Sequence, residues 1–440
     1  MVTQFTPHRR LLVLAIPMII ANVTTPILGL VDTAVLGHLP NVEALAGASI
    51  GALVITQLYW ICGFLRMSLT GLSAQAYGQK DLRQSPEYTM PVFQGLALAA
   101  CLALALLLTH VWLIPIVQSI AATDTLTSRY LDDYFTVRIW GAPAALGNLV
   151  LIGWLVGQQK TKHVLLIQVF GNLVNIVLSV LLVMGFGYEV KGVASATIIS
   201  EYLMFFASLW LCFQSLVPQR VKLAWFRWQS IRQLCSLNVA IFVRNLALQL
   251  CLAFITFQGA RLGAQTAAVN AILMQFFVLV SLGLDGIAYA VEALVGEAKG
   301  QGKASLITAH TQRGLLWSGA LALLYSSFFI IAGDWIIGLL TNNELLRNAA
   351  ADYTLIIVLL PVVAFWCFLF DGVFVGLSEG KAMRDTMVLS AVLGFFPVWW
   401  LLASFQNWAL WWAFLSFLGA RGITLGWTFW RHRQTGRWLD

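Results

Sequence analysis

The sequence predicts an all-α polytopic membrane protein with twelve transmembrane helices in two parallel six-helix bundles. Three observations predict it: an apolar composition, the number of long apolar runs, and a repeat that relates the two halves of the chain. Of the 440 residues, 60% are hydrophobic and 10% are charged, whereas a soluble domain usually has about 25% charged residues. A soluble core could not bury so much apolar surface, so the chain is expected to face lipid.

Twelve apolar runs reach the length of about 20 residues that a helix needs to cross a bilayer. The first run contains Asn22 and Pro26 and is too long for a signal peptide, so we interpret it as a spanning helix. Several runs exceed the minimum length, which allows a tilt or a kink. The expected spans are 11–36, 45–72, 90–117, 131–157, 163–185, 192–215, 235–260, 264–294, 312–339, 353–377, 384–404 and 407–430.

Basic residues gather at alternate ends of these runs. Of the 26 lysines and arginines, 18 fall at one end and four at the other. The positive-inside rule makes the basic end cytoplasmic, so both termini are expected in the cytoplasm, with the chain in a bacterial inner membrane. The net charge of +7 is then an orientation signal, and no nucleic-acid partner is expected. The four basic residues of the other end are Arg129, Lys191, Arg261 and Arg347.

The longest basic linker, residues 216–234, lies near the middle of the chain. It combines Trp225, Phe226 and Trp228 with lysine and arginine, a pattern typical of a segment on the membrane surface. We therefore predict an N-terminal six-helix lobe over 1–215, a cytoplasmic linker over 216–234, and a C-terminal six-helix lobe over 235–440.

Two short matches relate the halves to each other. SAQAYGQKD at 73–81 resembles VGEAKGQGK at 295–303, and GWLVGQQKTK at 153–162 resembles GVFVGLSEGK at 372–381. The offsets are 222 and 219 residues, and each spans six helices. An even number of helices gives the lobes the same orientation, so a pseudo-two-fold axis along the membrane normal is expected. Parallel lobes of this kind flank a central cleft and suit alternating access.

Ionisable residues inside the spans are few, which makes each of them a candidate functional residue. Asp32 follows Pro17 and Pro26 in the first span, and each proline removes a helical hydrogen bond and allows a bend. A charged Asp at the centre of a membrane helix costs roughly 2.5–3.5 kcal/mol. Two interpretations stay open: an interfacial carboxylate that reaches water, or a buried acid that takes up and releases a proton or another cation.

A polar stripe in the fifth span offers partners for Asp32. Asn172, Asn175 and Ser179 are spaced three and four residues apart, so they share one helix face. Thr197 in the sixth span adds a hydroxyl group. Hydrogen bonds between helices would also explain the two asparagines. Together with Asp32, these oxygens could hold a proton or coordinate sodium.

The C-terminal half has polar residues of its own. Asp285, Tyr289 and Glu292 form one stripe on the eighth span. These residues would either form structural ion pairs that brace the lobe or line a second site for a cation or a substrate. The same two interpretations apply to an acid in the tenth span and to arginines in the seventh and twelfth spans: Asp371, Arg244 and Arg421.

Other functional classes lack their signatures in this chain. The six cysteines form no CxxC pair, the six histidines are scattered, and neither HExxH nor a P-loop motif is present. An integral membrane enzyme would need clustered catalytic residues, and a channel would need a filter sequence. No enzyme activity, catalytic residue, metal site or cofactor is therefore expected.

Three stretches carry a resemblance to a known family. PMIIANVTTPILGLVDTAVLGHL (17–39), with its VDT-x-x-x-G-x-L pattern, resembles the first helix of multidrug and toxic compound extrusion (MATE) transporters. RMSLTGLSAQAYGQKD (66–81) resembles the end of their second helix, and LDGIAYAVEALVGEAKG (284–300) resembles the DinF-like branch. The resemblance covers the whole chain. It implies export of lipophilic, often cationic, drugs, driven by inward flow of protons or sodium.

The resemblance also implies roles for particular residues. It places the coupling acid on Asp32 and its polar partners on Asn175 and Thr197. Many relatives have a second aspartate where this chain has Ser179; the site is thus less charged, which favours protons over sodium. We expect a monomer that needs no cofactor beyond its coupling ion. The alternatives are sodium-coupled drug antiport and a flippase for a lipid-linked precursor, which would need extra helices or a strongly cationic cavity.

Overall fold

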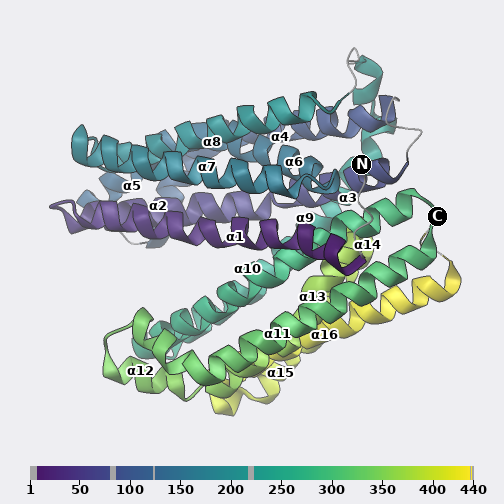
Figure 1. Ribbon diagram of the computed structural model, residues 1–440. Coiled ribbons are helices and arrows are strands. Elements are labelled where there is room, and N and C mark those ends of the chain that lie inside the picture. Colours follow the sequence, from purple (N-terminus) through teal and green to yellow (C-terminus); the bar gives the residue numbers. More distant parts are fainter. Residues whose placement is uncertain (1–6, 80–85, 122–123, 217–221, 437, 439–440) are drawn as a thin grey trace. The chain divides into compact units, whose positions relative to one another are not determined.

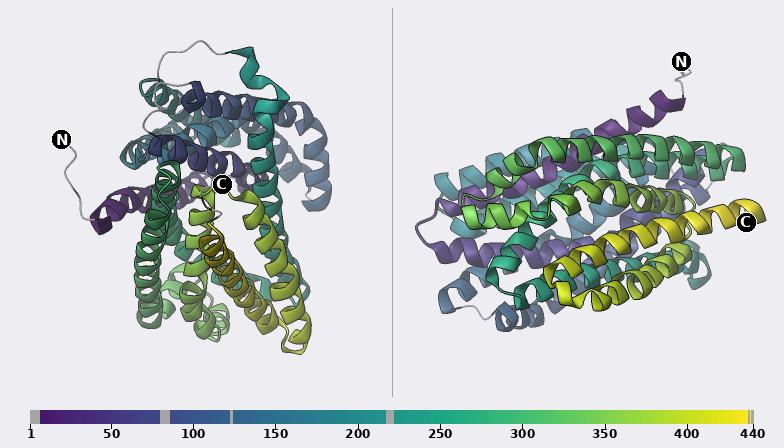
Figure 2. Two further views of the ribbon diagram at one scale, coloured as in Figure 1. Left: turned by 90° about the vertical axis from the view of Figure 1, so that its right-hand side faces the viewer. Right: turned by 90° about the horizontal axis from the view of Figure 1, so that it is seen from below.

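The computed structural model describes residues 7–79, 86–121, 124–216, 222–436 and 438 (Figure 1, Figure 2). The regular secondary structure of these residues is helical, with no strand, which confirms the all-α prediction. Contacts divide the chain into two compact units, Ile20–Cys235 and Met1–Ile19 with Ser236–Asp440. The helix α1 begins in one unit and ends in the other, because its residues before Ile20 contact the C-terminal half.

The Ile20–Cys235 unit contains most of α1 and the helices that follow it. In this unit α7 packs along α8, and α3 packs along α6 (Figure 1). The elements are α1 (Pro7–Gly37), α2 (Val42–Ile61), α3 (Phe64–Gly78), α4 (Pro86–Ala121), α5 (Thr125–Arg138), η2 (Ile139–Gly141), α6 (Ala142–Gly157), α7 (Thr161–Val180), η3 (Leu181–Gly185), α8 (Glu189–Phe213) and η4 (Leu223–Phe226).

The other unit adds the start of α1 to the C-terminal helices. Arg10 near the beginning of α1 pairs with Glu297 at 2.5 Å, and Gly286 packs against Ile19. The elements are α9 (Trp228–Arg261), α10 (Ala264–Gly300), α11 (Ala304–Leu340), α12 (Glu344–Ala351), α13 (Thr354–Gly376), α14 (Gly380–Ser390), η5 (Ala391–Phe395), α15 (Phe396–Leu401), η6 (Ala403–Phe405) and α16 (Asn407–Thr435).

Within the described part of the chain, eleven helical stretches are long and apolar enough to cross a membrane. They match eleven of the twelve expected spans, so the chain is a multi-pass membrane protein. The twelfth, expected over 384–404, is helical from Gly380 to Leu401, with the π-helical turn η5 between α14 and the short helix α15. Pro397 in the first turn of α15 has no N–H for a helical hydrogen bond, which explains the change of helix type.

The repeat seen in the sequence is also a repeat of helix contacts. In the first unit, α6 lies so close to α3 that a Cβ atom on Gly157 would be 2.6 Å from the carbonyl oxygen of Thr70. In the second unit, a Cβ atom on Gly376 would be 2.6 Å from the carbonyl oxygen of Glu292. Gly376 follows Gly157 by 219 residues, and Glu292 follows Thr70 by 222 residues. These are the same offsets that relate the two sequence matches.

The helices α6 and α13 also end in the same way. Gln159 and Ser378 both have a positive φ, of 60° and 56°. After each of them the backbone N–H of the next residue reaches back to the last helical turn, from Lys160 to Leu155 at 2.9 Å and from Glu379 to Phe374 at 3.0 Å. Residues 80–81 of the first sequence match lie outside the described residues.

These glycine contacts lead to a prediction for stability. Gly157→Ala and Gly376→Ala should each lower the free energy of unfolding by about 1–3 kcal/mol, because the added methyl group forces two backbones apart. Gly29→Ala and Gly333→Ala are the matched controls, since a Cβ atom there has nothing within 4 Å. Thermal unfolding of the purified variants measures the effect. Equal melting temperatures for all four variants would contradict this account of the repeat.

The linker 216–234 differs from the expectation of a segment on the membrane surface. Residues 217–221 lie outside the described residues, and α9 begins at Trp228. Trp225 is buried against α4, where its carbonyl oxygen accepts a hydrogen bond from Gln94 Nε2 at 2.7 Å. The surface placement is therefore wrong for Trp225, because its indole is buried against Phe93 of α4, with the ring centres 6.1 Å apart. The side chains of Phe226 and Trp228 are exposed.

Candidate cation site

The candidate site lies in the Ile20–Cys235 unit, where α1, α7 and α8 bring polar side chains together. Ser179 Oγ on α7 lies 3.0 Å from Asp32 Oδ1 on α1. Ser179 is fully buried, and Asp32 is partly exposed. The predicted pairing of Asp32 with the polar stripe on α7 is thus present, and the contact is made by Ser179.

A chain of hydrogen bonds continues from Ser179 into the protein. Ser179 Oγ also lies 3.1 Å from Asn175 Oδ1. Asn175 Nδ2 donates to Ser200 Oγ on α8 at 3.2 Å, and Ser200 Oγ donates to the carbonyl oxygen of Thr197 at 2.8 Å. Asn175 and Ser200 are each 1% exposed. The carboxylate of Asp32 is therefore the outer end of a buried polar chain that crosses three helices.

Two of the predicted residues lie elsewhere than expected. Asn172 Nδ2 donates to Thr24 Oγ1 at 3.0 Å, which joins α7 to α1 about two turns before Asp32. The hydroxyl of Thr197 donates to the carbonyl oxygen of Val193 in its own helix at 3.0 Å, so the backbone of Thr197, and not its side chain, joins the chain of hydrogen bonds. Threonines in helices commonly make this bond, because the carbonyl four residues earlier is within reach.

Sequence reasoning missed Ser200 and Thr24. Ser200 follows Thr197 by three residues and so lies on nearly the same face of α8. Thr24 precedes Asp32 by eight residues, which also places both on one face of α1. Helical spacing from the predicted residues could therefore have identified both of them.

A buried ion pair lies beside these helices. Arg138 at the end of α5 donates to both carboxylate oxygens of Glu201 on α8, at 2.9 and 2.5 Å. The guanidinium carbon of Arg138 lies 5.4 Å from the ring centre of Tyr59, a cation–π distance. Glu201 is one turn after Thr197, but it is paired with Arg138 and makes no described hydrogen bond to Asp32. Asp32 is thus the carboxylate at the outer end of the chain.

Pro17 and Pro26 do not interrupt α1. The helix is continuous from Pro7 to Gly37, with Pro17 buried and Pro26 exposed. Each proline leaves the carbonyl four residues earlier without its usual N–H partner. The helix can therefore bend at either position with less loss of hydrogen bonding than elsewhere.

The polar residues of the other unit form a separate cluster. Asp371 Oδ2 on α13 accepts hydrogen bonds from Arg421 Nη2 on α16, at 2.5 Å, and from Arg244 Nη2 on α9. Arg244 Nη1 also donates to Asn245 Oδ1 at 2.9 Å. Arg244, Asp371 and Arg421 are all buried. Two guanidinium groups on one carboxylate favour the interpretation of structural ion pairs that join three helices.

The predicted acidic stripe lies on α10 of the same unit. Glu292 is buried where Gly376 of α13 packs on its backbone, whereas Asp285 and Tyr289 are partly exposed. Among the residues that the structure describes, no group of three or more His, Cys, Asp or Glu side chains could hold a metal ion.

Comparison with known proteins decides the family. A model of the MatE family matches residues 17–181 and 240–400. The matched residues include Asp32, Asn175 and Ser179 of the candidate site. They also include Arg244 and Asp371 of the cluster in the other unit. The chain belongs to the MatE family. It is therefore related to transporters and not to enzymes, and its twelve-span architecture is that of the family.

Relatives agree with this membership. This chain is 40% identical over 431 residues to DNA damage-inducible protein F of Escherichia coli (strain K12). The match covers 97% of this chain and 93% of that protein. The predicted DinF-like branch is thus confirmed. It is 25% identical to multidrug resistance protein MdtK of Yersinia pseudotuberculosis, over 90% of this chain and 85% of that one.

Solved structures show the same fold. A crystal structure of MATE in the bent conformation matches with a TM-score of 0.84 at 16% identity, over 98% of this chain and 96% of that one. An outward-facing multidrug resistance MATE family transporter matches with a TM-score of 0.84 at 17% identity, over 99% and 97% of the two chains.

Proposed function

We propose that this MatE-family chain exports lipophilic, often cationic, compounds by antiport with protons that bind at Asp32. Relatives named as multidrug resistance proteins support the substrate class. The observation that carries the coupling proposal is the hydrogen bond between Ser179 and Asp32 at the end of a buried polar chain. We also propose that the chain acts as a monomer in a bacterial inner membrane, with both termini in the cytoplasm.

Ser179 can serve both protonation states of Asp32. A serine hydroxyl carries one hydrogen, and it can accept as well as donate. Next to a charged Asp32, that hydrogen points to the carboxylate. When Asp32 is protonated, its own hydrogen can point to Ser179 Oγ, and the hydrogen of Ser179 then points to Asn175 Oδ1, 3.1 Å away. A proton on Asp32 is thus accommodated by turning one hydroxyl group.

The same geometry favours protons over sodium. A sodium ion would need several oxygen ligands, and Asp32 is the carboxylate among these residues. The oxygens of Asn175, Ser179 and Ser200 already take part in hydrogen bonds to one another. A proton needs only one oxygen of Asp32, and it leaves the hydrogen bonds of Asn175 and Ser200 on α8 in place when the Ser179 hydroxyl turns.

Loss of charge on Asp32 is the proposed signal for a conformational change in α1. The neutral acid no longer needs strong hydrogen-bond donors, so α1 can bend near Pro17 or Pro26 and change its contacts with α7. One charge that moves through ~100 mV supplies about 2.3 kcal/mol. That free energy corresponds to roughly a 50-fold concentration ratio of a neutral substrate, which is enough for useful export.

Transport in proteoliposomes tests the coupling ion. A pH gradient and a sodium gradient are imposed separately on vesicles that hold the purified protein and a fluorescent lipophilic cation. We expect export with the pH gradient alone and none above protein-free vesicles with the sodium gradient alone. Export driven by sodium alone would contradict proton coupling and support the sodium-coupled alternative. Movement of a lipid-linked precursor in place of the cation would support the flippase alternative.

A further inference from the structure

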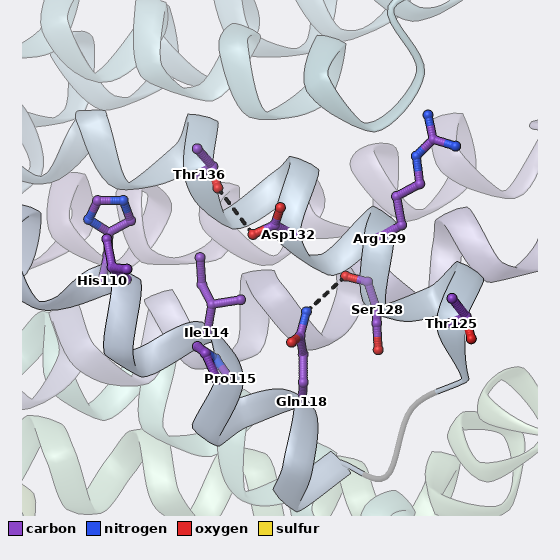
Figure 3. A pocket seen from close by; sticks show the side chains of 10 residues that line it. His110, Ile114, Pro115, Gln118, Thr125, Ser128, Arg129, Asp132 and Thr136 are labelled. Carbon is purple, nitrogen blue, oxygen red and sulfur yellow. Dashed lines mark hydrogen bonds between the residues drawn. The ribbon is translucent and has the colours of Figure 1, made fainter.

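A polar groove lies between α4 and α5, apart from the site at Asp32. Its volume is about 540 Å³, and the side chains that line it are shown in Figure 3. His110 and Gln118 come from α4, and Arg129 and Asp132 come from α5. Arg129 belongs to the end of the spans that carries few basic residues, so the groove is on the side opposite to the basic loops.

The local hydrogen bonds give the groove several acceptors. His110 Nδ1 lies 2.6 Å from the carbonyl oxygen of Leu107, so it carries the hydrogen, and Nε2 of the neutral ring is an acceptor. Gln118 Nε2 donates to the carbonyl oxygen of Ser128 at 3.1 Å, which directs its Oε1 the other way (Figure 3). The carboxylate of Asp132 is a third acceptor.

A proline adds a fourth acceptor on the same helix. Pro115 lines the groove and has no N–H to offer the carbonyl oxygen of Val111, which also lines it. His110 and Gln118 are eight residues, about 12 Å, apart along α4, so one ammonium group can use the acceptors near only one of them. Asp132 is one helical turn after Ser128, the partner of Gln118, so the carboxylate of Asp132 and Oε1 of Gln118 suit the N–H bonds of a primary ammonium group. They give no such advantage to a trimethylammonium group, which has no N–H to donate.

The groove also has a place for an anion. Arg129 is exposed at its edge (Figure 3), and its guanidinium group suits a phosphate, which it can bind through two parallel hydrogen bonds. Arg129 and Asp132 are three residues apart on α5, so they lie on nearly the same face. A ligand with a phosphate next to a primary ammonium group would match both charges.

The surface around the groove is apolar. Val111, Trp112 and Ile116 on α4 are 61%, 67% and 52% exposed, as expected for side chains that face acyl chains. Tryptophan is enriched where the hydrocarbon meets the headgroups. A ligand in this groove would thus hold its polar end between α4 and α5 and its apolar part against α4.

We propose that this groove binds the phosphoethanolamine headgroup of a membrane phospholipid. The phosphate binds Arg129, and the ammonium group binds Asp132 and Oε1 of Gln118. This site is independent of the proposed export function, because it uses none of the residues of the hydrogen-bond network that ends at Asp32.

Native mass spectrometry and thermal unfolding of the detergent-purified protein test the proposal. The protein is titrated with phosphatidylethanolamine, with phosphatidylcholine and phosphatidylglycerol of the same acyl chains, and with soluble phosphoethanolamine. We expect phosphatidylethanolamine to bind about tenfold more tightly than the other two lipids, since each lacks one charged hydrogen bond. Weaker binding of soluble phosphoethanolamine is expected as well, because it has no acyl chains.

Matched variants locate the effect. Asp132→Asn should remove the preference for phosphatidylethanolamine, and Arg129→Gln should weaken the binding of all three lipids, because all of them carry the phosphate. Asp334→Asn and Arg261→Gln, which change exposed residues on other helices, should do neither. All four side chains are exposed, so unfolding without added lipid should be unchanged. Equal affinity for the three lipids, binding of soluble phosphoethanolamine as tight as that of the lipid, a preference that survives in Asp132→Asn, or unchanged lipid affinity in Arg129→Gln would overturn the proposal.

Discussion

Asp32→Asn is expected to reduce export driven by a pH gradient to the level of protein-free vesicles. Asparagine has nearly the same shape as aspartate and can still accept a hydrogen bond from Ser179 through its amide oxygen. It cannot bind and release a proton, so the step that links proton entry to the movement of α1 is lost. Transport in proteoliposomes and drug resistance of cells that express the variant are the measurements.

The control for this variant is Ser179→Ala. That change removes the hydroxyl 3.0 Å from Asp32 but keeps the carboxylate, so export should be weakened and not abolished. The amount of protein in the membrane and its unfolding temperature should be near those of the wild type for Asp32→Asn. Full export by Asp32→Asn would show that the coupling proton binds elsewhere.

Asp371→Asn is expected to lower the free energy of unfolding by about 3–5 kcal/mol. The change removes the negative charge between the buried guanidinium groups of Arg244 and Arg421. Breaking a buried ion pair from one side leaves an uncompensated charge, which costs much more than the pair itself contributes. Thermal unfolding of the purified protein measures the loss.

Asp385→Asn provides the comparison for this second variant. Asp385 pairs with the neighbouring Arg384 at 2.7 Å, but its side chain is 64% exposed, so we expect a change below about 1 kcal/mol. The result also separates the two interpretations of the C-terminal cluster. A variant Asp371→Asn of normal stability that had lost proton or sodium coupling would favour a second cation site over a structural brace.

Much of the fold could be predicted from the sequence, because hydrophobic length and charge at the span ends follow directly from the bilayer. The glycine repeat was also visible, since only glycine allows α6 and α13 to approach a neighbouring backbone so closely. The π-helical turn after Ser390 was not visible, because the apolar run continues through η5 and α15. Hydropathy measures the tendency to enter lipid, not the type of helix.

The candidate site could be predicted only in part. Helical spacing identifies which residues share a face, and it placed Asn175 and Ser179 correctly beside one another on α7. Spacing does not tell which partner a polar side chain will choose. The hydroxyl of Thr197 bonds to its own helix, and Glu201 pairs with Arg138 from α5. Such choices depend on packing between helices that are distant in sequence.

The most direct test of the central claim measures proton movement driven by the substrate itself. Vesicles that contain the protein are loaded with a lipophilic cation and diluted into medium without it, at equal pH and equal sodium on both sides. The account predicts that the lumen becomes more acidic as the substrate leaves, and that vesicles with Asp32→Asn show only the change seen without protein. Substrate export by the wild type with no change in lumenal pH, or equal acidification by Asp32→Asn, would contradict proton antiport through Asp32.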